Sequence, residues 1–282
     1  MALLKMAEVF GHAVEDDTRS AHHNQEKRRC PFRNQPCTKG GTENPLGLCS
    51  LSDGDRLATL CPFRFTQDER LFTDAGRLAF GAKVKIVAAP EVRILRVTAQ
   101  DEAGQLRSKK IGKVDYLVAS LDSQGHPRDF AALEVQAVYF SGGSMRGPFQ
   151  EFLRTRRVAA DASRRPDWRS SAQKRLMPQL SLKVPVFRRW GKKFFVAVDS
   201  FFFASLPRMN RVPSLANSEI TWLVYPFSRR GHGYAMGDPD IVFSNWDEVM
   251  AALREGEAPD PAEILEEIER RARQGALPIR TT

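Results

Sequence analysis

The sequence predicts a mixed α/β fold in which a small cysteine-rich module precedes a larger domain. Three observations support this prediction: four cysteines in one short segment, β-rich runs that alternate with amphipathic segments, and an ordinary globular composition. Of the 282 residues, 42% are hydrophobic and 27% are charged, so the chain can bury a core. We expect the module over residues 1–67, including an N-terminal helix, and the larger domain over residues 68–282. No apolar run approaches the ~20 residues that span a bilayer, so no membrane association is expected.

The four cysteines lie within 32 residues, and the rest of the chain contains none. Their spacing, C-x6-C-x11-C-x11-C, lacks the C-x2-C pair of common zinc modules. Four thiolates in one turn-rich segment match a closed tetrahedral metal site, which stabilises a fold and has no open position for catalysis. Zinc and iron both accept four thiolates. Two disulfides would need an oxidising compartment, and unlinked thiols would be expected to scatter. The ligands of the expected site are Cys30, Cys37, Cys49 and Cys61.

The N-terminal elements are weakly patterned. We expect a short amphipathic helix over residues 1–14, a loop over residues 15–29 and little regular structure in the cysteine segment. A bound metal would then supply stability that this segment cannot obtain from a core of its own. A helix is predicted over Asp68–Phe80, with apolar residues on one face and Gly81 placed to end it.

The central and C-terminal segments alternate between expected strands and helices. β-branched and aromatic residues dominate the strands, and apolar residues at helical spacing mark the helices. Pro90 separates the first two strands, and Pro178 is a candidate break in the helix of the basic region. The expected strands are 83–89, 92–98, 111–121, 129–140, 194–203 and 221–227, and the expected helices are 171–183, 246–254 and 261–273.

The functional hypothesis depends on the β-rich runs 111–121 and 129–140. A turn centred on Gln124–Gly125 places Asp115 directly opposite Glu134. Opposed Cβ atoms lie about 4.5–5.5 Å apart, so two carboxylates would meet on one sheet face. Because like charges repel there, a divalent cation such as Mg²⁺ is expected between them, where it can activate water for phosphodiester hydrolysis. The alternative is an ordinary exposed hairpin, which the apolar flanking residues disfavour.

Basic residues concentrate between Arg146 and Lys193, where the sequence contains fourteen Lys and Arg but only three acidic residues. A solvated helix normally mixes both signs, so this excess is typical of a nucleic-acid-binding surface. Arginine outnumbers lysine there, and its planar guanidinium suits phosphate and guanine edges. No apolar face accompanies the charge, which disfavours a membrane surface. The candidate DNA-contacting residues are Arg154, Arg156, Arg157, Arg164, Arg165 and Arg169.

Together, these features resemble the NotI-type restriction endonucleases. The likeness covers residues 5–140 and fades beyond them. It is carried by Glu8-Val9-Phe10-Gly11-His12, the four cysteines with their Cys-Pro frames, Phe80-Gly81, Val87-Ala88-Ala89-Pro90 and the Asp115…Glu134-x-Gln136 motif. The resemblance implies a PD-(D/E)xK nuclease fold, in which helices flank a mixed central sheet. It also implies a type II restriction endonuclease that cuts both strands of a specific, palindromic DNA site.

The resemblance assigns roles to individual residues. Asp115 and Glu134 are implied to be Mg²⁺ ligands with the Val135 carbonyl, while Gln136 fills the position usually held by lysine. Val114 replaces the usual proline of the motif. A neutral amide cannot act as a general base near pH 7, so Gln136 would orient the attacking water. Iron is the implied metal of the four cysteines, with zinc as the alternative. A homodimer on double-stranded DNA, a cytoplasmic location in a bacterium and a separate DNA methyltransferase in the host are further implications.

Two other classes of protein share part of this pattern. A DNA-binding regulator with a four-cysteine metal site would need no pairing of Asp115 with Glu134. A repair or RNA nuclease would share the acidic site but lack sequence preference. The products formed from plasmid DNA separate the three classes.

Overall fold

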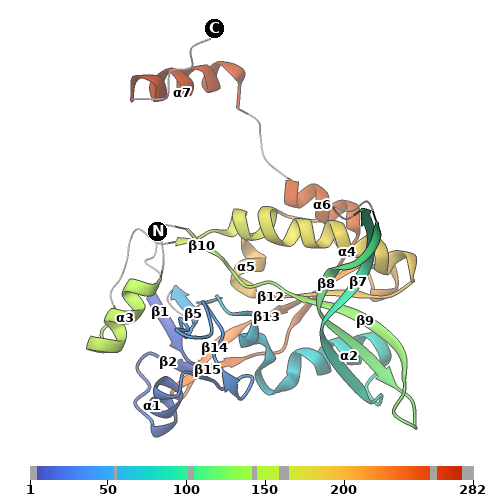
Figure 1. Cartoon of the computed structure of the whole chain (residues 1–282), viewed down its shortest axis with the longest axis horizontal. Helices are drawn as coiled ribbons and strands as arrows, with labels where there is room; N and C mark the ends of the chain where they lie inside the picture. Colours follow the sequence, from blue (N-terminus) through green and yellow to red (C-terminus); the bar gives the residue numbers. More distant parts are fainter. Residues whose placement is uncertain are drawn as a thin grey trace.

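The computed structural model describes residues 5–53, 56–100, 105–141, 145–158, 165–254 and 259–274. Its centre is a six-stranded sheet in the order β16-β13-β12-β9-β8-β7 (Figure 1). β12 is parallel to β9 and β13, whereas the other neighbours are antiparallel, so the sheet is mixed as predicted. The six strands are β7 (Ile86–Gln100), β8 (Leu106–Leu121), β9 (Pro127–Val135), β12 (Phe194–Asp199), β13 (Ile220–Tyr225) and β16 (Asp240–Ser244).

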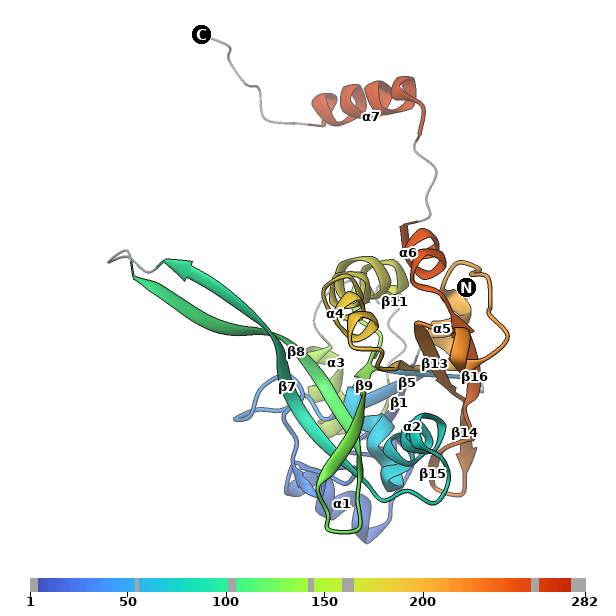
Figure 2. The ribbon, with the colours of Figure 1, turned by 90° about the vertical axis from the view of Figure 1, so that its right-hand side faces the viewer.

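Helices cover both faces of this sheet, which confirms the predicted mixed α/β fold. One face packs against α2 (Arg70–Phe80) and the 3₁₀ segment η1 (Pro62–Glu69). The other face packs against the π-helical segment η2 (Ser170–Leu176), α4 (Met177–Arg189), α5 (Ser200–Ser205) and α6 (Trp246–Arg254). Figures 1 and 2 show α4 and α6 on the side opposite to α2.

Strand β12 shows why the sheet is buried on both faces. Phe194, Val196 and Val198 lie in the cluster with α4 and α6, whereas Phe195 and Ala197 lie in the cluster with α2. All six residues of the strand are buried. A strand between two helical layers has to be apolar on both sides, so its sequence reads as a continuous apolar run without alternation.

The N-terminal region forms a second, four-stranded sheet in the order β2-β1-β5-β6. The prediction of a helix over residues 1–14 is wrong for the described residues 5–14. Phe10 and Gly11 have φ values of 46° and 79°, so the chain reverses between β1 and β2 where a helix would have to continue. The strands are β1 (Lys5–Val9), β2 (His12–Ala13), β5 (Leu48–Asp53) and β6 (Arg56–Thr59).

The predicted loop over residues 15–29 contains helix α1 (Arg19–Glu26), so that prediction is also wrong. Thr18 caps the helix, because its hydroxyl accepts a hydrogen bond from the backbone N–H of Ala21 at 3.3 Å. The cysteine segment is more regular than expected as well, since β5 and the short hairpin of β3 (Arg29–Cys30) and β4 (Gln35–Pro36) lie within it.

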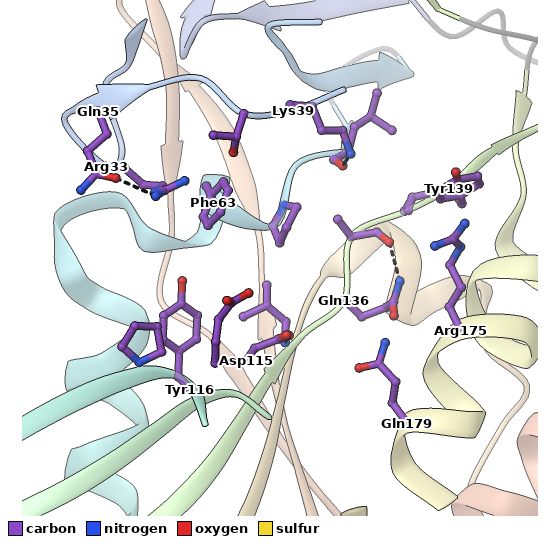
Figure 3. Close-up of a pocket in the computed structure, with 18 residues that line it drawn as sticks. Arg33, Gln35, Lys39, Phe63, Asp115, Tyr116, Gln136, Tyr139, Arg175 and Gln179 are labelled. Carbon is purple, nitrogen blue, oxygen red and sulfur yellow. Dashed lines mark hydrogen bonds between the residues drawn. The ribbon is translucent and has the colours of Figure 1, made fainter. Parts of the chain in front are cut away.

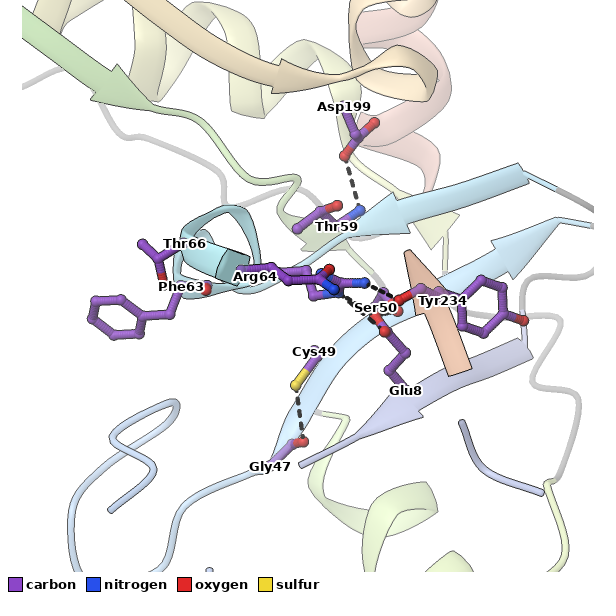
Figure 4. A network of polar contacts seen from close by, with 11 residues as sticks. Glu8, Gly47, Cys49, Ser50, Thr59, Phe63, Arg64, Thr66, Asp199 and Tyr234 are labelled. Atoms are coloured by element: carbon purple, nitrogen blue, oxygen red, sulfur yellow. Dashed lines mark hydrogen bonds and ion pairs between the residues drawn. The ribbon is translucent and has the colours of Figure 1, made fainter. Parts of the chain in front are cut away.

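A buried polar network joins the N-terminal sheet to the rest of the chain (Figure 4). The Arg64 guanidinium forms a fully buried ion pair with Glu8 at 2.9 Å and donates to the Tyr234 carbonyl at 2.7 Å. The Ser50 hydroxyl donates to Glu8 at 2.6 Å. Tyr234 belongs to the hairpin of β14 (Phe227–Arg230) and β15 (Gly233–Met236). Removal of one partner would leave a buried charge unpaired, so the network ties these elements together. The division at residues 67 and 68 stays a prediction.

The remaining boundaries agree with the sequence in part. α2 ends at Gly81, whose φ of 96° needs glycine, and α6 and α7 (Pro261–Arg273) have the predicted bounds. β7 continues through Pro90, which the sequence suggested as a break. The strand expected to reach residue 203 ends at Asp199, and that residue caps α5. Pro178 lies where the π-helical η2 passes into α4, and the helical backbone continues across this junction, so no break occurs.

Of the other described elements, β10 (Phe140–Ser141) pairs with β11 (Arg165–Pro166), α3 (Arg146–Thr155) lies between these two strands in the chain, and η3 (Leu215–Asn217) precedes β13. β9 ends at Val135, so the strand expected over 129–140 is split into β9 and β10. No described helix is long and apolar enough to cross a membrane.

Candidate active site

The register of β8 and β9 is the one predicted from the turn. Tyr116 pairs with Leu133 and Leu117 pairs with Ala132, so the next position on each strand is Asp115 and Glu134. One register irregularity lies next to the turn, between Ser120 and Leu121, and it does not affect these pairs. The structure therefore brings Asp115 and Glu134 together, each from its own strand.

The two carboxylates replace the backbone ladder at this point. The backbone N–H of Val135 donates to Asp115 Oδ2 at 2.9 Å, and the backbone N–H of Asp115 donates to Glu134 Oε1 at 3.3 Å. Each acid thus fixes the main chain of the other strand beyond the last paired residues, Tyr116 and Leu133. This reciprocal bonding holds both side chains at the end of the ladder.

Lys183 of α4 is a third charged group of the site. Its Nζ lies 2.7 Å from Glu134 Oε1 and 3.2 Å from Gln179 Oε1. Glu134 is 1% exposed and Lys183 is 4% exposed, so this ion pair is buried. The sequence analysis did not identify Lys183. The available signal was a lysine between Leu180 and Phe187, on the helix face that is otherwise apolar.

Burial disfavours the ionised form of both acids. Burial and the nearby Asp115 charge raise the pKa of Glu134 to about 7, against the lowering effect of Lys183. Burial also raises the pKa of Asp115, although the N–H of Val135 and the charge of Lys183 lower it. Glu134 Oε2 is buried and has no hydrogen-bond partner among the described residues. A buried carboxylate oxygen without a partner is costly, so this donor set fits a bound cation.

A cavity of about 790 Å³ opens in front of these residues (Figure 3). Asp115, Val135 and Gln136 line one side of it, and Gln136 is largely buried, with its side-chain amide donating to the Ala137 carbonyl. Figure 3 shows Arg33 and Lys39 on the opposite side. The cavity therefore places the Asp115 carboxylate opposite a basic wall, an arrangement suited to a phosphate group beside a metal ion, whereas Glu134 is buried and does not line the cavity.

The cysteine segment builds that basic wall. Arg33 follows the Cys30 frame directly and stacks over the Phe63 ring at 4.0 Å. Lys39 lies close behind Cys37 in the chain, and its Nζ donates to the Leu60 carbonyl at 2.5 Å. Arg175 of η2 lines the cavity on the helical side, over the Tyr139 ring at 3.5 Å. Two of these cations therefore belong to the cysteine segment.

The four cysteines are buried free thiols. The charges of Cys30 and Cys61 help raise the pKa of Cys49 after burial, and Cys30 and Cys37 act in the same direction on Cys61, whose pKa rises to about 11. The four sulfur atoms are thus electrostatically coupled. Across the described ranges, no group of three or more His, Cys, Asp or Glu side chains has the arrangement of a metal-ion site.

Backbone N–H groups nevertheless point at three of the sulfurs. The backbone N–H groups of Arg33 and Phe32 lower the pKa of Cys30, that of Phe63 lowers the pKa of Cys61, and that of Gly11 lowers the pKa of Cys49, so each favours the thiolate against burial. In this structure the Cys49 thiol itself donates to the Gly47 carbonyl at 3.7 Å (Figure 4). Hydrogen bonds from backbone N–H groups surround the sulfur ligands of iron and zinc sites, so the chemistry of the donor set fits a thiolate-bound metal.

The candidate DNA-contacting arginines do not form one surface in the described part of the chain. Arg154 is paired with Glu151 at 2.6 Å, and the Arg156 guanidinium donates to Gln25 and lies over the Phe152 ring at 5.8 Å. Arg157 and Arg169 are exposed. Arg164 and the side chain of Arg165 lie outside the described residues. Their role in DNA contact stays a prediction.

A family model described as restriction endonuclease NotI matches residues 8–236. The match takes in the cysteine segment, α4 and most of both sheets; β16 and the first residues of β1 lie outside it. It extends well past residue 140, so the sequence-based limit of the resemblance was too short. No curated protein matches the chain.

Proposed function

The chain belongs to the restriction endonuclease NotI family, and from this premise we propose that it is a Mg²⁺-dependent type II restriction endonuclease that cuts both strands of a palindromic DNA site. The observation that carries the proposal is the pair of hydrogen bonds that binds Asp115 and Glu134 to each other's strands, beside the partnerless Glu134 Oε2. Two buried acids at the end of a ladder repel each other, and the single charge of Lys183 offsets only one of the two, which leaves room for a bound cation.

We assign the metal ligands to Asp115, Glu134 and the Val135 carbonyl. When bound, Mg²⁺ neutralises the two acids and lowers the pKa of a coordinated water, so that hydroxide is available near neutral pH. Gln136 lines the cavity and orients the attacking water through its amide, since an amide exchanges no proton near pH 7. A phosphate group in the cavity would contact Arg33 and Lys39, whose charges stabilise the phosphorane-like charge of the transition state.

Lys183 supplies the positive charge that Gln136 lacks. In the resemblance, the motif position of Gln136 is usually a lysine. Lys183 reaches Glu134 Oε1 from α4 at 2.7 Å, on the helix that covers this face of the sheet. It does not line the cavity, so we assign it a positioning role: it lowers the pKa of Glu134 against burial and fixes the orientation of its carboxylate.

The four cysteines are proposed to hold one iron ion, with zinc as the alternative. The N–H groups directed at Cys30, Cys49 and Cys61 support thiolate ligation. A four-thiolate site has no open position, so its contribution is structural. It would fix the loops that carry Arg33 and Lys39 into the cavity wall.

A homodimer follows from the proposed reaction, because one two-fold axis relates the two strands of a palindromic site. Helix α7 offers a surface for association. Its exposed Ile264, Leu265 and Ile268 form an apolar stripe, and an isolated helix of this length is marginal in water without a partner.

Plasmid cleavage tests the proposed function. Purified protein is incubated with plasmid DNA in Mg²⁺ and, separately, in EDTA, together with Glu134→Gln and the exposed control Glu263→Gln. Discrete fragments in Mg²⁺ alone, lost in Glu134→Gln and kept in Glu263→Gln, support the proposal. Smeared DNA would identify the nuclease without sequence preference, and intact DNA with retained binding would identify the DNA-binding regulator.

A further inference from the structure

The hairpin of β7 and β8 extends beyond the central sheet as a two-stranded arm, shown at the left of Figure 2. β9 pairs with β8 only over Tyr116–Leu121, whereas β7 pairs with β8 as far as Gln100 and Leu106. We define the arm as residues 92–100 of β7 and 106–113 of β8. No third strand pairs with the arm; Ile94 near its root packs against the core, but the exposed side chains farther out have to be explained in another way.

The charge of the arm is of one sign. It carries six exposed Lys and Arg and no acidic residue. Directly opposed pairs repeat the sign, since Arg93 lies opposite Lys113 and Arg96 lies opposite Lys110. Glu91, just outside the arm, pairs with Lys113 at 2.6 Å. The six cations are Arg93, Arg96, Arg107, Lys109, Lys110 and Lys113.

Protection of an edge strand from aggregation is the ordinary explanation for a lysine on a free strand. One or two charges suffice for that purpose, and they need not face each other. Like charges directly opposite each other destabilise a strand pair. The pairing of Arg96 with Lys110 therefore costs free energy in the isolated protein, and an anion placed along the arm would recover it.

The arm is also continuous with the acidic site. β8 carries Asp115 at its base and runs outward to Arg107, eight residues away. At ~3.4 Å per residue this is a reach of about 27 Å, which approaches the ~34 Å of one duplex turn. The major groove of DNA also accepts a two-stranded β-ribbon. A duplex whose scissile phosphate lies at Asp115 therefore passes within reach of the arm.

We propose that the β7–β8 arm is a docking surface for duplex DNA, in which its Lys and Arg side chains contact the phosphate backbone flanking the cleaved bond. The inference rests on the proposed function for the position of the DNA. The charge argument alone already selects a polyanion over an apolar partner. Strand β8 carries both residues 106–113 of the arm and Asp115, whereas the arginines of the Arg154–Arg169 segment lie elsewhere in the chain.

Salt-dependent binding tests the arm. The triple variant Arg96→Gln, Lys109→Gln and Lys110→Gln is compared with a control that removes three exposed charges outside the arm, Arg208→Gln, Arg211→Gln and Arg230→Gln. The probe is a labelled duplex of about 40 base pairs and mixed sequence in EDTA, titrated between about 50 and 200 mM salt. We expect the triple variant to lose about 10²-fold in affinity and about 2.7 in the slope of log affinity against log salt. The control should lose clearly less of both.

The outcomes separate this inference from the proposed function. Equal losses in the two variants, or none in the triple variant, overturn the arm as a DNA surface while plasmid cleavage by the unaltered protein still stands. A protein that cuts no plasmid, yet loses binding in the triple variant, keeps the arm and overturns the nuclease. Sedimentation velocity measures the oligomeric state of the triple variant. If that state changes while the salt slope of DNA binding does not, the arm is a contact between protomers, and the inference is overturned.

Discussion

Single residues explain how the acidic pair is held. Asp115 and Glu134 were predictable from the sequence, because the turn at Gln124–Gly125 fixes the register and the register fixes which side chains meet. Lys183 was not predictable, since its contact with Glu134 depends on how α4 lies across the sheet. Local patterns describe a helix face, but they do not say which strand residue that face meets.

Replacement of Lys183 by Met should change the pH dependence of cleavage. Without the ammonium group, the pKa of Glu134 should rise further above about 7, because burial and Asp115 are then less opposed. The lower limb of the pH–rate profile should move up by about one unit, and the rate at pH 7 should fall by about 10²-fold. Plasmid cleavage measured across the pH range at saturating Mg²⁺ checks this result.

Lys192→Met is the matched control, because Lys192 also forms an ion pair, with Asp129, but lies away from the cavity. Its profile should match that of the unaltered protein. A Lys183→Met variant that is folded by circular dichroism and keeps the original profile would remove Lys183 from the positioning role.

At the scale of elements, the sequence predicted whether most long segments are helix or strand. It did not predict where a strand passes into a helix within one apolar run. The apolar run after Phe194 was read as one strand, yet it ends at Asp199 and continues as α5. Asp199 Oδ1 accepts from the Phe202 N–H at 2.6 Å, and Oδ2 accepts from the Thr59 N–H at 2.8 Å. The helix cap thus also joins β6 of the N-terminal sheet to the central sheet. Apolar composition could not reveal this, because strand and helix are equally apolar here.

Asp199→Asn should remove a pH-dependent part of the stability. Burial raises the pKa of Asp199 to about 6 from a usual value near 3.9, so the folded state binds more protons than the unfolded state between these values. The contribution of Asp199 is therefore fully present below about pH 4 and declines by up to about 3 kcal/mol as pH rises past 6. Asparagine has no such dependence, and it cannot accept the Thr59 N–H through its NH₂ group.

Urea unfolding of both proteins between pH 4.5 and pH 7 measures the difference. The deficit of Asp199→Asn should be largest at the acidic end and should shrink toward neutral pH. A deficit that stays constant over this range would contradict a raised pKa at Asp199.

At the scale of the whole molecule, the cysteine segment is continuous with the nuclease core. One apolar cluster contains Val9, Cys30 and Leu48 from the N-terminal region together with Phe149 and Trp222 from the rest of the chain. The position of the four cysteines predicted a structural module, but its packing depends on long-range contacts that spacing does not encode. The sequence could therefore indicate a metal site without indicating that the same segment lines the cavity beside Asp115.

Loss of the thiolate metal should destabilise the whole chain in a single step. Cys61→Ser removes one ligand, and a structural four-thiolate site contributes several kcal/mol to folding. With a shared core, one calorimetric transition should remain and move down by about 10 °C or more. Elemental analysis should find about one iron or zinc per chain before the change and much less after it.

Two calorimetric transitions, of which only the first moves to a lower temperature in Cys61→Ser, would instead favour a separate module over residues 1–67. An unchanged transition temperature with no metal in the unaltered protein would contradict the thiolate site.

The root of the arm has one more consequence. Glu91 and Gly112, which flank Asp115 on the two strands, have φ values of 58° and 65°, and a Cβ at Gly112 would come within 3.0 Å of Leu95. If duplex DNA docks on the arm as proposed, a tilt of the arm would be transmitted through this unusual backbone to the carboxylate of Asp115, three residues from Gly112. A DNA sequence that fits the arm poorly would then leave Asp115 misplaced and would not be cleaved. Discrimination between DNA sites would therefore not depend on base contacts alone.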